Sequence, residues 1–260
     1  MTFLKKQSIK QTASKTADHS VSNNQITEGV IWKQLLIFFF PILFGTFFQQ
    51  LYNTVDAIIV GRFVGKQALA AVGGPTGTVI NLLIGFFVGL SSGATVIISQ
   101  YYGAKREEMV GYAVHTAITA SVISGAVLMV IGFVSAPFAL NAMGTPEDIV
   151  GFATLYMRIY FLGTIANLIY NIGSGILRAV GDSKRPLYFL IASCFANIIL
   201  DIVFVVYFHM GIAGAALATI ISQCVSAFLV IWVLGRTSDM YQLHFSKLVL
   251  EIRMEKRIVR

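Results

Sequence analysis

Two acidic residues are unusual because they lie inside long apolar stretches. The chain has twelve Asp and Glu residues, and of these only Asp56 and Asp201 fall within apolar tracts. A carboxylate inside a membrane helix costs several kcal/mol, so such residues usually mark an ion or substrate path. If the two lie close together, one proton or one Na⁺ would relieve both their burial and their mutual repulsion. The pair would then titrate as a unit.

Polar residues recur at three- and four-residue spacing along four apolar tracts, which places each set on one helix face. The sets are Thr46, Gln49, Asn53 and Asp56; Thr164, Asn167, Asn171 and Ser174; Ser193, Asn197 and Asp201; and Thr219, Ser222 and Ser226. Because such faces are costly in lipid, we expect them to converge on a polar interior, with Gln49, Asn53, Asn167 and Ser193 lining the cavity. The alternative for the Ser and Thr residues is that they only bond one helix to another.

Carboxylate, amide and hydroxyl oxygens are the ligands that hard cations prefer. Asp56, Asn197, Asp201 and Thr219 supply this set. Counted from the predicted outer ends of their helices, Asp56, Asp201 and Thr219 lie at a similar depth of about 8–12 Å, at 1.5 Å per residue. The sequence therefore predicts a site for H⁺ or Na⁺ at this level.

The elements that carry these residues are predicted to be membrane-spanning helices. Hydrophobic residues make up 56% of the chain and charged residues 12%, against about 25% charged in a soluble domain. Six tracts approach or exceed the length of about 20 residues that spans a bilayer as a helix. They run over residues 32–60, 69–100, 112–138, 149–177, 186–208 and 211–234. We predict an all-α bundle of six transmembrane helices over 32–234, a polar tail over 1–31 and a basic segment over 235–260.

The distribution of Lys and Arg predicts the orientation. Sixteen of the nineteen lie on one side, in the two terminal segments and in the loops after the second and fourth tracts. The opposite loops hold Arg62 and Lys66, and Arg158 lies inside the fourth tract near that side. By the positive-inside rule both termini are cytoplasmic. The same placement explains the net charge of +7 without a nucleic-acid partner.

No motif of an enzyme is present in the sequence. The stretch GRFVGKQ does not match a phosphate-binding loop, and the four His residues are scattered. Cys194 and Cys224 both fall in apolar tracts and are interpreted as packing residues. We therefore expect no enzymatic activity and no cofactor other than a coupling ion, with energy from an ion gradient or another subunit.

Small residues and prolines predict details of the packing. Gly85, Gly89 and Gly93 form a G-x-x-x-G run that would let a neighbouring backbone approach closely, and Gly214 begins a similar run in the last tract. Pro41 is expected to kink the first helix, whereas Pro186 suits a first helical turn.

Four motifs in order resemble the multidrug and toxic compound extrusion (MATE) transporters, over about residues 35–234. They are QQLYNTVDAIIVGRFVGKQALAAVG, GLSSGATVIISQYYGAKR, NIGSGILRAVGDSKRP, and NIILDIVFV with GIAGAALATIISQ. The resemblance implies one six-helix lobe, the N-terminal one, of a two-lobe exporter that exchanges lipophilic cations and other xenobiotics for H⁺ or Na⁺ in a bacterial plasma membrane. In bacterial members the positions of Asp56, Asn197, Asp201 and Thr219 form the coupling-ion site, and Asn171 matches a position beside it.

The chain stops after six helices, whereas the family has twelve. The sequence is therefore interpreted as a partial sequence lacking the second lobe or as a half that assembles with a partner. One alternative function is a flippase for lipid-linked or polysaccharide precursors, although intramembrane Lys and Arg are scarce for that role. Another alternative is a membrane assembly subunit that transports nothing, in which Asp56 and Asp201 would tolerate asparagine.

Overall fold

The structure, a computed structural model, describes residues 31–244, which form helices joined by short turns. In chain order they are α2 (Ile31–Ile59), η1 (Val60–Val64), α3 (Lys66–Gly73), α4 (Pro75–Gly103), α5 (Glu107–Ala142), α6 (Glu147–Leu162), α7 (Thr164–Ala179), α8 (Lys184–Asp201), η2 (Ile202–Tyr207) and α9 (Gly211–Arg236), where η1 and η2 are π-helical. Residues 1–37 and 38–260 form two separate units, and the arrangement below concerns the second. The predicted tail and most of the basic C-terminal segment lie outside the described residues.

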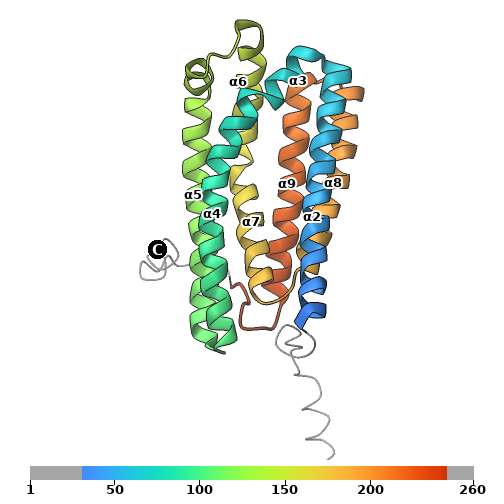
Figure 1. Cartoon of the computed structure of the whole chain (residues 1–260). Coiled ribbons are helices and arrows are strands. Elements are labelled where there is room, and N and C mark those ends of the chain that lie inside the picture. Colours follow the sequence, from blue (N-terminus) through green and yellow to red (C-terminus); the bar gives the residue numbers. More distant parts are fainter. Residues whose placement is uncertain (1–30, 245–260) are drawn as a thin grey trace, which may run out of the picture. The chain divides into compact units, whose positions relative to one another are not determined.

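Most of the helices are long and apolar enough to cross a membrane. Within residues 31–244, five segments meet this criterion, and six do if the bent pair α6–α7 counts as one span. Successive passes run in opposite directions, as Figure 1 shows for α4, α5 and the α6–α7 pair. The predicted all-α, multi-pass membrane protein is thus confirmed.

Two of the predicted tracts are broken by glycine. The second tract divides at Gly74, where a Cβ would lie 2.7 Å from the Ala70 carbonyl oxygen and where Pro75 begins α4. The fourth tract bends by 52° between α6 and α7 at Gly163. A Cβ at Gly163 would lie 2.8 Å from the Ile220 side chain of α9, so glycine leaves room for this side chain. Pro41 lies within α2, which continues as one helix to Ile59.

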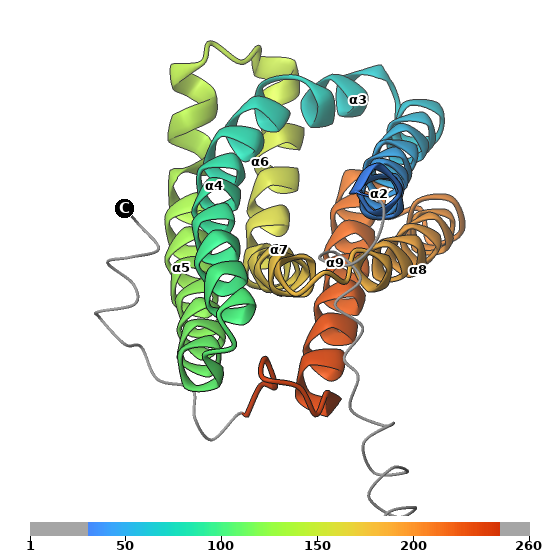
Figure 2. The same ribbon diagram turned by 60° about the horizontal axis from the view of Figure 1, so that its bottom comes forward.

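Consecutive long helices of the second unit run antiparallel, whereas α7 also packs against α4 and α9, which run parallel to it. α8 packs against α9, and α5 packs against α4, α6 and α7 (Figure 2). One apolar cluster, which includes Val60, Val205 and Ile212, lies at the end of the bundle that holds η1 and η2. A second cluster, which includes Leu177 and Leu234, fills the other end. The polar residues of α8 and α9 lie between these two ends along their helices.

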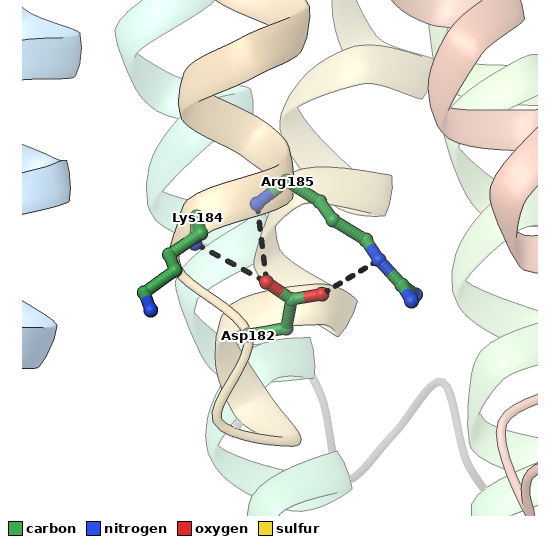
Figure 3. Close-up of polar contacts among 3 residues, drawn as sticks. All are labelled: Asp182, Lys184 and Arg185. Carbon is green, nitrogen blue, oxygen red and sulfur yellow. Dashed lines mark hydrogen bonds and ion pairs between the residues drawn. The ribbon is translucent and has the colours of Figure 1, made fainter.

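The turn between α7 and α8 shows how an aspartate begins a helix. Gly181 adopts a φ of 92°, and Asp182 follows it. One oxygen of Asp182 accepts from the backbone N–H groups of Lys184 and Arg185, at 3.2 and 3.1 Å, and the other lies 3.2 Å from Nε of Arg185 (Figure 3). A carboxylate is favoured there because the first N–H groups of a helix lack partners within it. Pro186 lies in this first turn, as predicted.

The predicted role of the first glycine run was wrong for two of its members. A Cβ at Gly85 or Gly89 would have nothing within 4 Å, so neither glycine marks a close contact in this lobe. Gly214 does mark one, since its Cβ would lie 3.1 Å from Phe204. Close approach occurs instead on α5, where a Cβ at Gly125 would lie 2.8 Å from the Ile165 Cα of α7.

The chain leaving α9 is tied to two neighbouring helices. Tyr102 of α4 donates to the Asp239 carboxylate at 3.2 Å, and the His244 backbone N–H donates to Nε2 of His115 on α5 at 3.0 Å. Tyr241 and Leu243 are buried in the apolar cluster at that end. The first part of the segment predicted over 235–260 is therefore part of the packed lobe.

Candidate functional site: two carboxylates between π-helical turns

Asp56 and Asp201 both lie within one turn of a change in helix type. Asp56 is in the last turn of α2 and is followed by η1, while Asp201 ends α8 and is followed by η2. The two π-helical segments contact each other. Asp56 is 6% exposed and Asp201 is fully buried, and the two carboxylates interact electrostatically. The structure thus brings these residues together, close to the apolar cluster that includes Val60 and Val205.

An amide and a hydroxyl lie beside the carboxylates. Asn197 precedes Asp201 by one helical turn on α8 and is 1% exposed. Thr219 of α9 is 3% exposed, and its hydroxyl donates to the Ala215 carbonyl at 3.0 Å. The hydroxyl oxygen keeps a free lone pair, since its proton is used within the helix. Because α8 packs on α9, both residues lie at the same interface.

Several polar atoms of this cluster are buried without a partner. Among the described residues, Oδ1 of Asp56, both carboxylate oxygens of Asp201 and both amide atoms of Asn197 have no hydrogen bond. A buried polar atom left unpaired costs about 1–3 kcal/mol. Such atoms in a native protein call for an explanation, and an ion is one. Three carboxylate oxygens and one amide oxygen are ligands that suit H⁺ or Na⁺.

Asn171 and Asn167 pair with each other on α7. The Asn171 amide donates to the Asn167 backbone carbonyl at 2.8 Å and to its side-chain oxygen at 3.0 Å. Both residues are partly buried, and their hydrogen bonds within the described residues join them to each other and not to Asp56 or Asp201. Their place beside the cation site therefore remains a prediction.

The other predicted cavity residues have different surroundings. Gln49 and Asn53 of α2 are exposed, and the Asn53 amide donates to Gln50 at 3.3 Å. Ser193 is buried, and its hydroxyl donates to the Ser222 carbonyl of α9 at 2.7 Å. Ser193 thus joins α8 to α9, which is the alternative that the sequence left open for its Ser and Thr residues.

We expect Ser193→Ala to lower stability modestly, because it removes one interhelical hydrogen bond worth about 0.6–1.7 kcal/mol in a membrane protein. The loss should appear as a lower thermal unfolding midpoint of the purified chain in detergent. Ser92→Ala is the control, since Ser92 is exposed on α4. Equal midpoints for the two variants would show that the Ser193 bond contributes nothing.

Tyrosines that the sequence analysis did not select lie near the site. Tyr156 of α6 is 5% exposed, interacts electrostatically with Asp56 and hydrogen bonds to the Thr219 side chain. One turn further along both helices, Tyr160 accepts from the Gln223 amide at 3.4 Å. Tyr156 and Tyr160 are four residues apart on α6, as Thr219 and Gln223 are on α9, so each pair lies on one helix face. This matched spacing is the feature of the sequence from which the two tyrosines could have been selected.

The lobe as a whole is similar to known proteins. The MatE family model matches residues 41–203. This chain belongs to the MatE family. It is 36% identical over 234 residues to YoeA of Bacillus subtilis (strain 168), which is named as a probable multidrug resistance protein. This alignment covers 88% of this chain and 50% of YoeA.

Solved MATE structures have the same fold. The crystal structure of MATE in the bent conformation is 27% identical, with a TM-score of 0.82 over 90% of this chain and 52% of its own. An outward-facing multidrug resistance MATE transporter of the MOP superfamily is also 27% identical, with a TM-score of 0.80 over 87% of this chain and 50% of its own. The chain thus spans about half the length of these relatives, and it supplies the fold of one transporter lobe.

Proposed function

We propose that this MatE chain is the N-terminal lobe of a multidrug exporter that exchanges lipophilic cations for H⁺ or Na⁺ at Asp56, Asn197, Asp201 and Thr219. The proposal places it in a bacterial plasma membrane with both termini cytoplasmic. The cluster of unpaired buried oxygens around Asp56 and Asp201 is the observation that carries the ion-exchange part. The names of the relatives support multidrug efflux.

The arrangement suits an ion that acts as a switch between conformations. A cation can drive a conformational change only if it binds one state more tightly than the other. Asp56 lies in the last turn of α2 and Asp201 ends α8, so a movement of α2 relative to α8 can change the distance between their carboxylates. Bringing the acids together without a cation is costly, whereas a bound H⁺ or Na⁺ offsets that cost. We propose that α2 makes this movement by bending near Pro41.

The substrate path needs a second lobe. Transporters built from two repeated halves place substrate at the interface between them. The chain spans half of YoeA, so the second lobe would follow in the same polypeptide or come from a partner half. The inward-open state would accept a lipophilic cation as substrate. Binding of H⁺ or Na⁺ at Asp56 and Asp201 would then favour release of this substrate outside.

The test is drug efflux by the two-lobe transporter in vesicles with an imposed H⁺ or Na⁺ gradient. Asp56→Asn and Asp201→Asn should each reduce gradient-driven efflux of a cationic dye at least ten-fold, because neither variant keeps the charged pair. Asp148→Asn is the matched control, since Asp148 is exposed in the first turn of α6. Efflux that is undiminished in both site variants would rule out the proposed mechanism.

A further inference from the structure

Arg158 is an intramembrane cation that the ion site does not use. It lies on α6, about 16 Å along the helix from Glu147 at 1.5 Å per residue. Its guanidinium carbon is 5.3 Å from the centre of the Phe133 ring on α5, and its Nε is buried without a hydrogen bond. Within residues 31–244 the one ion pair joins Asp182 and Arg185, so Arg158 has no carboxylate partner there. An unpaired arginine inside a membrane is costly and usually functional.

An apolar groove of about 250 Å³ lies next to this arginine. It is lined by Met129, Val130, Phe133 and Val134 of α5 and by Leu162 of α6. Its lining is exposed on the outside of the lobe, since Val130 is 58% and Leu162 50% exposed. Phe133 therefore contacts the guanidinium and the groove at once.

The groove and the charge are ordered along the membrane normal. α5 and α6 are antiparallel and meet at a short turn, with Arg158 and Phe133 at one level. Leu162 lies one turn beyond Arg158, and Met129 lies one turn before Phe133, so both are further from the α5–α6 turn and closer to the membrane centre. Side chains tilt towards the N-terminal end of their helix, so we expect the long Arg158 side chain to reach from α6 towards the membrane surface.

We propose that Arg158 and this groove bind one anionic phospholipid of the leaflet that holds the α5–α6 turn. The phosphate pairs with the Arg158 guanidinium, and an acyl chain lies in the groove below it. The order of charge and groove is that of a lipid in its leaflet, with the head group towards the surface and the chain towards the centre. Arginine suits this role because its planar fork binds phosphate oxygens in pairs. The choice of the outer leaflet rests on the proposed orientation, and no other part rests on the proposed function.

The test measures retention of dioleoyl phosphatidylglycerol by the purified chain in detergent, using native mass spectrometry. Arg158→Leu should weaken binding about ten-fold or more, as expected for loss of a charge-assisted hydrogen bond. Arg158→Lys should cause a smaller loss, since it keeps the charge without the fork. Val130→Trp keeps the arginine but fills the groove, and it should also weaken binding. Arg62→Leu is the control, because Arg62 is exposed on the same side of the lobe.

Two further probes separate the phosphate from the chain. Dioleoylglycerol lacks the phosphate and should bind at least ten-fold more weakly than the phospholipid, and inorganic phosphate should not displace the phospholipid. Full retention in Arg158→Leu, equal binding of dioleoylglycerol, or displacement by inorganic phosphate would each overturn the proposal. Asp56→Asn should retain the lipid normally, so loss of ion exchange and loss of lipid binding are distinguishable.

Discussion

Replacing Asp201 by asparagine should make the purified chain more stable while it abolishes ion exchange. Asp201 is fully buried, and neither of its oxygens has a hydrogen-bond partner among the described residues. Removing an unpaired buried charge while keeping the shape of the side chain should therefore stabilise the fold by about 1–3 kcal/mol. For a chain of this length that is a rise of about 2–12 °C in the thermal unfolding midpoint.

The rise in the thermal unfolding midpoint of Asp201→Asn should depend on the cation supplied. If the site binds H⁺ or Na⁺ as proposed, the charge at Asp56 and Asp201 has the least relief in a Na⁺-free buffer at alkaline pH. The difference in midpoint between Asp201→Asn and the wild-type chain should be largest there. Added Na⁺ or acid should stabilise the wild-type chain through binding to the folded state and should narrow that difference. Asp56→Asn should behave similarly but with a smaller rise, since only one of its oxygens is buried without a hydrogen-bond partner.

Two results would decide whether the Asp201 carboxylate serves ion exchange or stabilises the fold. Asp148→Asn, the exposed control, should leave the midpoint and its cation dependence unchanged. A lower midpoint for Asp201→Asn under every condition would show that the Asp201 carboxylate stabilises the fold through contacts of its own. The pair would then be a structural feature, and the ion-exchange proposal would lose its main support. Such a gain of stability with loss of function is typical of active sites.

The spans were predictable because lipid leaves few alternatives to a helix. Long apolar tracts without alternation must satisfy their backbone internally. The breaks at Gly74 and Gly163 were not predicted, since glycine is common in membrane helices and a break depends on what packs there. At Gly163 the reason is the approach of Ile220 from α9, which a single tract does not reveal. The π-helical segment Ile202–Tyr207 contains neither Gly nor Pro, so nothing in its sequence indicated a change of helix type.

The candidate site was partly visible in the sequence. Asp56 and Asp201 stand out because charges are rare in apolar tracts, and their helix directions placed them at similar depth. The direction that each helix face points in the bundle depends on how the helices pack. The residues that surround Asp56 and Asp201 were therefore harder to predict from the sequence. Ser193 bonds to the α9 backbone, while Gln49 is exposed. Tyr156 was missed because an aromatic residue in an apolar tract looks like part of the core.

Gly125→Leu should prevent the chain from folding, because α5 and α7 touch at this point. Gly125 is buried, and its Cβ would lie 2.8 Å from the Ile165 Cα and 3.3 Å from the Ile165 nitrogen. These are backbone atoms, so no rotation of a side chain relieves the overlap. Overpacking a core commonly costs about 1–3 kcal/mol even where side chains can adjust. We expect about that loss for Gly125→Ala and no monodisperse protein for Gly125→Leu.

Gly89→Leu is the matched control, since Gly89 also lies within a long membrane helix but has open space around it. It should give monodisperse protein in size-exclusion chromatography, with a thermal midpoint near that of the wild-type chain. Leucine also has a higher helix propensity than glycine, by up to about 1 kcal/mol, which should offset small losses. Normal folding of Gly125→Leu would mean that α5 and α7 lie further apart than described. The bend at Gly163, which brings Ile165 to α5, would then need revision.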